Sequence, residues 1–151
     1  MTPNQAEINK QIVRRYAEKV FVSGDLGAIG ETIAPDYVHH SPSAPGVVGI
    51  DAMADLVRAF RRSFSDISLT VDDMVAQGDR VATRLRISAV HSGEYDGIAA
   101  TGKRVTLHGM AIDRIEDGKI AEGSKLSDAH DLRNQIFGAP PNARNGPENS
   151  T

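Results

Sequence analysis

The feature of this sequence that most constrains its fold is a change in hydrophobic period near Phe64. Before this point, apolar residues recur at every third or fourth position, which is the spacing of amphipathic helices. After it, apolar and polar residues alternate, for example over residues 67–71 and 81–87, and such alternation is typical of half-buried strands. Helices followed by consecutive strands predict an α+β fold with an antiparallel sheet.

Three helices are predicted in the N-terminal half of the chain. The first covers residues 6–22 and carries one apolar stripe, the second covers about 25–33, and the third covers about 49–64 with a second apolar stripe. A short extended segment at residues 37–40 and a loop rich in proline and glycine at residues 41–49 separate the second helix from the third.

The C-terminal half is predicted to fold as strands joined by hairpin turns. Gln77-Gly78-Asp79 supplies the first turn, and a loop follows at residues 93–102. Strands are then predicted over residues 104–115 and 119–126, on either side of Glu116-Asp117-Gly118. Glycine in this last segment is a strong hairpin signal, because it adopts left-handed backbone angles without strain.

The domain organisation follows from the length of the chain and from its C-terminal composition. A chain of 151 residues has the usual size of a single domain, and we place this domain at residues 1–138, with a closing helix at 128–137. Residues 139–151 have neither periodicity nor apolar content, so they are predicted to form a disordered tail.

The composition argues against several classes of function. The net charge is −3 and the isoelectric point is about 5.9, so no basic field would attract nucleic acid. The chain has no cysteine, which excludes disulfides, thiolate catalysis and cysteine-bound metal. No segment approaches the roughly eighteen apolar residues of a membrane span. The N-terminal segment does not resemble a signal peptide, so we expect no membrane contact and a cytoplasmic protein.

The register of the last hairpin decides which side chains share a face. A two-residue turn at Asp117-Gly118 pairs Ile115 with Ile120 and places Asp128 opposite Leu107. A three-residue loop with Gly118 as a bulge gives a different pairing, and composition leaves both forms open. We prefer the three-residue form, in which Ile115 pairs with Lys119, Met110 with Ser124, His108 with Leu126, and Thr106 with Asp128.

In the preferred register, His108, Met110 and Asp128 share a face of mixed apolar and titratable character, which a ligand pocket requires. Desolvation beside Met110 and Leu126 would raise the pKa of the Asp128 carboxyl and make it a usable base. The alternative is structural: Asp128 caps the closing helix by accepting a hydrogen bond from His130 or Asp131. The residues alone do not decide between these roles.

The order and spacing of several short segments resemble the SnoaL-like polyketide cyclases and ester cyclases, which belong to the nuclear transport factor 2-like superfamily. The matching segments are Tyr37-Val38-His39-His40-Ser41-Pro42 with Pro45-Gly46, Gly78-Asp79-Arg80-Val81-Ala82, His91-Ser92-Gly93-Glu94, Thr101-Gly102-Lys103-Arg104-Val105, Arg114 to Ile120, Glu122, Asp128, Leu132, Gln135 and Gly138. The resemblance implies a cone-shaped barrel in which N-terminal helices pack on a curved antiparallel sheet.

The resemblance also implies an activity. The family position matched by Asp128 is the acid/base group of cyclases that close a ring by intramolecular aldol condensation, without metal or organic cofactor. On this basis Asp128 is expected to be catalytic, with His108 as a hydrogen-bond donor to a substrate oxygen. Many members carry tryptophan at the position of Ser124, and serine there is expected to widen the pocket or to remove a stacking surface.

Other residues are candidates for contact with a small hydrophobic substrate of polyketide or terpenoid type. The substrate-binding candidates are His40, His91, Met110, Ser124, Glu122 and Tyr37. His39 is expected to point away from the pocket into solvent. The histidines show no metal-binding spacing, so we expect no metal.

Three functions follow as hypotheses. The first is a cofactor-independent lyase or isomerase of the cyclase type that uses Asp128. The second is an epoxide hydrolase on the same fold, which would use Glu122 and Arg114 to activate water. The third is a non-catalytic ligand-binding module, since a fold does not determine a function. A homo-oligomer, either dimer or tetramer, is expected through the exposed face of the sheet.

Overall fold

The N-terminal part of the chain forms the predicted helices. In the computed structural model, which describes residues 4–138, the helices are α1 (Gln5–Tyr16), its π-helical continuation η1 (Ala17–Val22), α2 (Gly27–Thr32) and α3 (Gly49–Ser63). Asn4 begins α1 by accepting a hydrogen bond from the backbone N–H of Glu7 at 2.9 Å. The predicted disordered tail, residues 139–151, lies outside the described residues.

Six strands form one sheet with the order β2-β1-β6-β5-β4-β3. They are β1 (Ile33–His40), β2 (Val47–Val48), β3 (Phe64–Gln77), β4 (Arg80–His91), β5 (Arg104–Glu116) and β6 (Lys119–Ser127). The α+β class with helices packed on the sheet is confirmed. The sheet is mixed rather than antiparallel, however, because β1 runs parallel to β6, and its edge strands do not pair to close a barrel.

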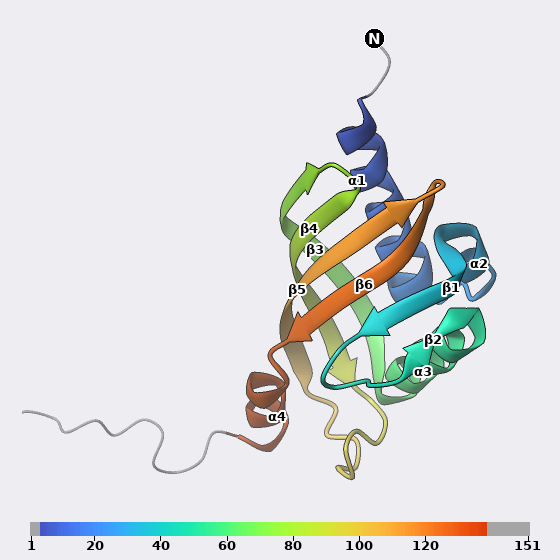
Figure 1. The fold of residues 1–151 in the computed structure, drawn as a ribbon. Helices are drawn as coiled ribbons and strands as arrows, with labels where there is room; N and C mark the ends of the chain where they lie inside the picture. The colour runs from blue at the N-terminus through green and yellow to red at the C-terminus, as the bar shows by residue number, and fades with distance from the viewer. Residues whose placement is uncertain (1–3, 139–151) are drawn as a thin grey trace, which may run out of the picture.

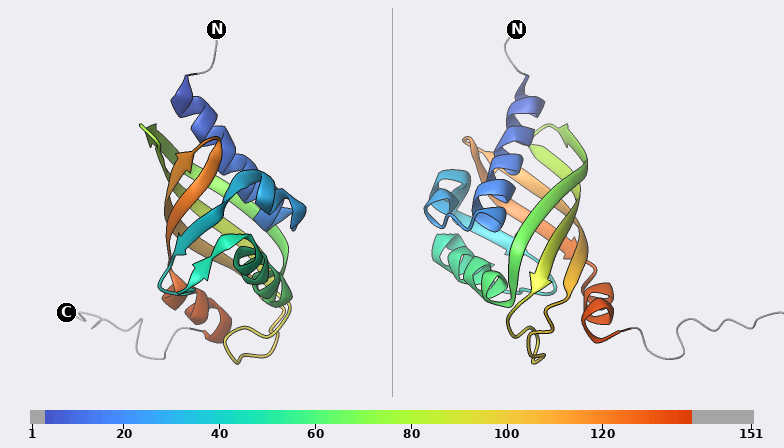
Figure 2. Two further views of the ribbon diagram at one scale, coloured as in Figure 1. Left: turned by 45° about the vertical axis from the view of Figure 1, so that its right-hand side comes forward. Right: turned by 180° about the vertical axis from the view of Figure 1, so that it is seen from behind.

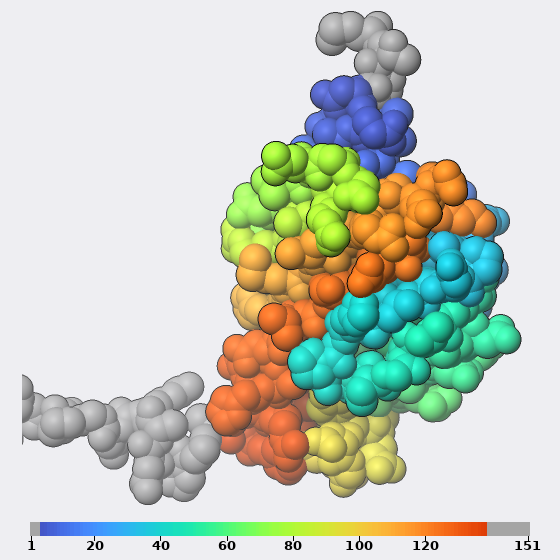
Figure 3. Space-filling view, in the orientation of Figure 1, coloured from blue at the N-terminus to red at the C-terminus, as the bar shows by residue number. Residues whose placement is uncertain are grey.

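The helices lie on one side of a strongly curved sheet. Figures 1 and 2 show α1, α2 and α3 against its concave face, with α4 (Ala129–Phe137) at one end beside the loop that precedes β5. Figure 3 shows the opposite, outer face, where β6 lies between β1 and β5. None of the helices between residues 4 and 138 combines the length and apolar character that a membrane crossing requires.

The β5–β6 hairpin differs from the register that we preferred. Asp117 and Gly118 both have positive φ, of 51° and 75°, and form a two-residue turn that pairs Ile115 with Ile120. The register then shifts by one residue, because Arg114 pairs with Glu122 and leaves Ala121 as a bulge. The three-residue loop was therefore wrong, and the bulge was not predicted by either alternative.

This bulge decides which side chains of β6 face the helices. Asp113 pairs with Gly123, Ala111 with Lys125 and Gly109 with Ser127, and these pairs lie on the concave face. His108, Met110 and Ile112 alternate with them and lie on the outer face.

Candidate functional site

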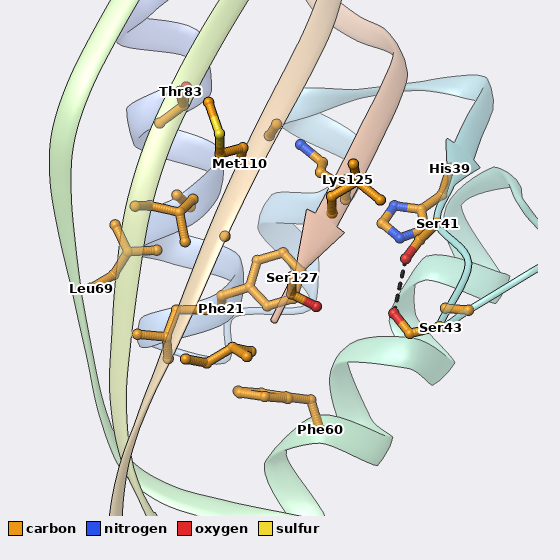
Figure 4. Close-up of a pocket in the computed structure, with 18 of the residues that line it drawn as sticks. Phe21, His39, Ser41, Ser43, Phe60, Leu69, Thr83, Met110, Lys125 and Ser127 are labelled. Atoms are coloured by element: carbon orange, nitrogen blue, oxygen red, sulfur yellow. Dashed lines mark hydrogen bonds between the residues drawn. The ribbon is translucent and has the colours of Figure 1, made fainter. Parts of the chain in front are cut away.

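The helices and the curved sheet enclose a cavity of about 210 Å³. Its wall is mostly apolar and combines residues from η1, α3 and the inner face of β3, β4 and β5, among them Phe21, Leu56, Phe60, Leu69, Leu85, Ile87 and Leu107. Figure 4 shows Phe60 at one end of this pocket, and Thr83 and Lys125 toward the other. A mostly apolar hollow with a few polar groups at one end is the usual character of a small-molecule site.

An ion pair forms the polar end of the cavity. The Lys125 Nζ atom lies 2.5 Å from Asp113 Oδ1, and both residues line the cavity. The Asp113 side chain is fully buried, whereas 24% of the Lys125 side chain is accessible. Lys125 also lies 6.0 Å from the centre of the Tyr16 ring, within range of a cation–π interaction. A buried carboxylate is therefore kept beside a cation that can reach a ligand.

Three buried polar atoms at this end have no hydrogen-bond partner among residues 4–138. They are Asp113 Oδ2, Thr83 Oγ1 and Tyr16 Oη, and all three residues line the cavity. Buried polar groups in proteins are nearly always paired, so three unpaired ones around one cavity indicate that a ligand or water completes them. The set combines two hydroxyl groups, which can donate, with a carboxylate oxygen, which can accept.

The polar cluster also includes a hydrogen bond between Tyr37 and His39 and a close approach of side chains to the backbone at Gly123. The Tyr37 hydroxyl lies 3.1 Å from His39 Nδ1, and His39 lines the cavity. Gly123 lies between Tyr37 and Asp113, and a Cβ at this position would be 2.6 Å from Tyr37 Oη and 2.8 Å from Asp113 Oδ1. Only glycine leaves room for both groups to approach β6 so closely.

Burial favours the neutral forms of two tyrosines and one histidine in this cluster. Burial raises the pKa of Tyr16, and the proximity of Tyr37 and Asp113 adds to the rise, although Tyr16 Oη makes no hydrogen bond of good geometry in the described part of the chain. Burial likewise raises the pKa of Tyr37, and Asp113 adds to it. Burial and then the Lys125 charge lower the pKa of His39. Both tyrosines thus stay protonated donors at neutral pH.

The arrangement supports acid–base chemistry on a carbonyl compound. A substrate oxygen in the cavity could accept a hydrogen bond from Lys125, and the Asp113 carboxylate belongs to the same cavity wall. Donors placed where negative charge develops lower the barrier to enolate formation, and a carboxylate within reach of the proton serves as the base.

Asp128 does not lie in this cavity. It is exposed, and its carboxylate caps α4 by accepting a hydrogen bond from the backbone N–H of Asp131 at 2.9 Å. Its own N–H donates to the carbonyl of His108 at 2.9 Å. The capping alternative is confirmed. The expected pocket with Thr106, His108 and Met110 around Asp128 is not formed, because His108 and Met110 lie on the outer face of the sheet.

Most of the other predicted site residues lie on the outer face of the sheet. His108 is exposed and lies opposite Arg86, and Met110 is 61% exposed at the border of both the cavity and an outer groove. Ser124 lines only the outer groove, so its small side chain does not widen the inner cavity. His40 and Glu122 form an exposed pair at 2.7 Å.

The remaining predictions have mixed outcomes. His91 is fully buried, and its Nδ1 lies 2.9 Å from Thr101 Oγ1, away from the residues that line the cavity. Tyr37 is fully buried and belongs to the polar cluster. The expectation that His39 points into solvent was wrong, because His39 is only 8% exposed and faces inward with Tyr37. No group of three or more potential metal ligands forms within residues 4–138.

Asp113 and Lys125 were missed by the sequence reasoning. Both have apolar outward-facing neighbours, such as Ile112 and Leu126, so the hydrophobic pattern suggests the opposite orientation for each strand. The one available signal was Gly123, a glycine in mid-strand, which often marks a close approach of other groups to the backbone.

The comparisons with known proteins agree with this fold. The family model described as SnoaL-like polyketide cyclase matches residues 10–136. A search of curated proteins gave no significant match.

Several solved structures are similar over most of the chain. TsrD from Streptomyces laurentii is 28% identical, with a TM-score of 0.78, and the match covers 89% of this chain and 98% of TsrD. IdmH from Streptomyces antibioticus, a proposed polyketide cyclase, is 28% identical with a TM-score of 0.76 and coverage of 85% and 98%. AclR from Streptomyces galilaeus, a proposed hydroxylase, is 29% identical with a TM-score of 0.79 and coverage of 90% and 100%.

Proposed function

Because the chain belongs to the SnoaL-like polyketide cyclase family, we propose that it is a cofactor-independent enzyme that removes a proton next to a carbonyl group of a small hydrophobic substrate. Asp113 is the acid/base group in this proposal. The observation that carries it is the burial of Asp113 at the cavity wall, with Oδ2 unpaired in the described part of the chain. A buried carboxylate oxygen without a hydrogen-bond partner lowers the stability of the fold. Its presence at a cavity wall therefore favours a role in binding or catalysis.

The proposed reaction begins with proton transfer from carbon to Asp113. The C–H bond breaks, its proton bonds to Oδ2, and the electron pair forms the enolate double bond while negative charge moves to the carbonyl oxygen. The Lys125 ammonium and the Tyr16 hydroxyl donate hydrogen bonds to that oxygen. The Tyr16 hydroxyl keeps its proton at neutral pH, since burial raises the pKa of Tyr16.

The enolate can then react in two ways, each of which conserves all atoms and charges. In an isomerisation of a β,γ-unsaturated carbonyl compound, the electron pair extends over the neighbouring double bond, and Asp113 returns the proton to the γ-carbon. In a cyclisation, the enolate carbon bonds to a second carbonyl carbon of the same substrate, and the proton on Asp113 ends on the new alkoxide oxygen. Both outcomes restore the carboxylate of Asp113 and consume no other reactant.

The resemblance of the sequence to the family points to Asp128 as the acid/base group, and this remains the competing hypothesis. Its exposed position and its role as the cap of α4 favour Asp113 instead. The two carboxylates can be separated by matched substitutions, Asp113→Asn and Asp128→Asn, since each removes one negative charge and keeps the size of the side chain.

Deuterium uptake tests the proposal without knowledge of the natural substrate. Methyl alkyl and aryl methyl ketones are incubated in D2O with each protein, and deuterium at the carbons next to the carbonyl is measured by mass spectrometry. The wild-type protein is expected to exceed the buffer rate, and Asp113→Asn to lower the enzymatic rate at least about a hundredfold, the usual contribution of a general base. Circular dichroism verifies that both variants are folded.

Two results would overturn the proposal. If Asp128→Asn loses exchange while Asp113→Asn keeps it, the acid/base group is Asp128. If ketones bind to the wild-type protein but exchange no faster than in buffer, the chain is a ligand-binding module rather than an enzyme. The epoxide hydrolase alternative has less support, because Arg114 and Glu122 pair with each other at 3.3 Å and neither lines the inner cavity.

A second copy of the chain remains the expected macromolecular partner. Met110, Ile112 and Leu126 are 61%, 49% and 66% exposed on the outer face of the sheet, and apolar side chains gathered on one face favour association. Sedimentation velocity of the wild-type protein and of Ile112→Lys tests this. The wild type is expected to be a dimer or larger, and a monomeric wild type would contradict it.

A further inference from the structure

A second compartment adjoins the inner cavity at its apolar end. A hollow of about 270 Å³ lies between α3, α4 and the loop before β5. The two hollows share lining residues at their junction, namely Ser43, Ala44, Leu56, Phe60, Leu107 and Ser127. A ligand that enters the inner cavity can therefore extend past Phe60 toward α4.

The two adjoining compartments differ in chemistry. The inner end carries Asp113 and Lys125, with polar atoms that lack partners among residues 4–138. The far end is lined largely by apolar groups, including Phe64 and Leu132. The Ser63 hydroxyl at this end already donates a hydrogen bond to the carbonyl of Glu94 at 2.6 Å, so it offers little to a ligand.

We infer that the substrate is an elongated amphipathic carbonyl compound that binds with its polar head at Asp113 and Lys125 and its apolar tail in the compartment beneath α4. This inference rests on the proposed function, because it identifies the head with the reacting carbonyl. The reverse orientation would place the carbonyl in the more apolar of the two compartments and leave the polar atoms of the inner end unpaired, which is unfavourable at both ends.

The length of the tail should therefore control affinity. Methyl ethyl, methyl hexyl and methyl decyl ketones present the same head with tails of increasing length, and their Kd values can be measured by titration calorimetry or ligand-observed NMR. Burial of each methylene tightens binding by about fourfold. Methyl hexyl ketone is thus expected to bind at least about thirtyfold tighter than methyl ethyl ketone, because incomplete burial reduces the full gain.

Two substitutions test the two ends separately. Ala59 lines only the second compartment and is exposed on α3, so Ala59→Trp should fill that space without disturbing the core. It is expected to remove most of the gain of methyl hexyl ketone and to leave methyl ethyl ketone unchanged. Lys125→Met is expected to weaken every ketone by the same factor, about tenfold, since it removes a charged donor to the head. Ala99→Trp, on the exposed loop before β5 and in neither compartment, is the matched control.

Each outcome has a clear consequence. If affinity does not rise with tail length, or if Ala59→Trp leaves the rise intact, the tail does not occupy the second compartment. If Lys125→Met leaves every Kd unchanged, the head does not bind at the inner end. All of these are binding measurements, so they are independent of the exchange assay. A protein that selects long ketones but fails to exchange deuterium would retain the binding mode and lose the proposed reaction.

Discussion

The Lys125 ammonium lies 2.5 Å from the Asp113 carboxylate, and the two residues are diagonal neighbours on the inner face of the β5–β6 hairpin. Asp113 pairs directly with Gly123, so Lys125 reaches it from two residues further along β6. The register of the hairpin thus places the two side chains next to each other on adjacent strands.

Loss of either partner should destabilise the protein. Lys125→Met leaves a buried carboxylate without its cation, which typically costs about 3–5 kcal/mol for a fully buried pair. Because 24% of the Lys125 side chain is accessible, we expect about 2–3 kcal/mol, after reduction for solvent screening. A double-mutant cycle with Asp113→Asn, measured by urea denaturation, should give a coupling energy of at least about 1 kcal/mol.

The exposed pair of Arg84 and Asp73 is the control for this cycle. Its atoms lie 2.7 Å apart, but its side chains are 54% and 70% exposed. The same cycle there should give about 0.5 kcal/mol or less. Equal coupling energies at the two sites would mean that burial does not strengthen the pair of Asp113 and Lys125.

Gly123 should not tolerate a side chain. In Gly123→Ala, the new methyl group would lie 2.6 Å from Tyr37 Oη and 2.8 Å from Asp113 Oδ1. Asp113 is held by Lys125 and Tyr37 by His39, so neither neighbour can withdraw freely. We expect a loss of about 1–3 kcal/mol in the free energy of unfolding.

Gly30→Ala is the matched control for this substitution. Gly30 lies in α2, and a Cβ there would meet its nearest atom, Ile50 Cδ1, at 3.6 Å, an ordinary contact. Alanine in a helix also restricts the unfolded chain, so this variant should be neutral or stabilised by up to about 1 kcal/mol. The prediction about Gly123 is contradicted if both variants unfold at the same urea concentration.

The hydrophobic period predicted the elements of this fold because it reflects burial directly. The change of period at Phe64 coincides with the junction of α3 and β3. The parallel pairing of β1 with β6 could not be predicted in this way, since the alternation within β1 is the same for either direction of its neighbour.

The site was harder to predict because its strands reverse the usual alternation, in which apolar side chains face inward and polar side chains face outward. On β5 and β6, the inward positions hold Asp113, Gly123 and Lys125, whereas outward positions hold Ile112 and Leu126. A shift of one residue at the Ala121 bulge exchanges the two faces of β6, and no residue type marks this bulge. Polar residues at inward-facing strand positions break the usual relation between hydrophobicity and burial, and such exceptions are expected at functional sites.

His39 should make stability depend on pH. Burial and then the Lys125 charge lower its pKa in the folded protein, so below about pH 6.5 the unfolded chain binds a proton that the folded protein excludes. Stability contributed by neutral His39 is therefore present above that pH and decreases as the pH falls toward the lowered pKa. His39→Asn, which can keep a hydrogen bond to Tyr37, should show a flatter decrease between about pH 7 and pH 5.

His130→Asn provides the reference for this measurement. His130 is exposed on α4, so His130→Asn repeats the same substitution outside the buried cluster. Urea denaturation at a series of pH values measures all three proteins. Identical slopes for His39→Asn and the wild type would show that His39 does not contribute.

Beyond the end of β6, the side chain of Gln135 forms the hydrogen bonds that a neighbouring strand would form with β5. The last pair of the hairpin joins Gly109 to Ser127, and beyond it Gln135 on α4 continues the hydrogen bonding of β5. Its Oε1 accepts from the N–H of Thr106 at 2.8 Å, and its Nε2 donates to the carbonyl of Thr106 at 2.7 Å. These two bonds attach α4, and with it one wall of the second compartment, to the sheet.

Gln135→Leu should therefore loosen α4 and weaken binding of long tails together. It removes both bonds and leaves the Thr106 backbone groups unpaired, at a cost of about 2 kcal/mol. Amide hydrogen exchange in α4 should become faster, and methyl hexyl ketone should lose most of its advantage over methyl ethyl ketone because the compartment is no longer closed. Asn134→Leu is the control, since the Asn134 side chain makes no hydrogen bond within residues 4–138. If Gln135→Leu speeds exchange in α4 but leaves the preference for long ketones intact, the tail does not depend on α4 for its binding site.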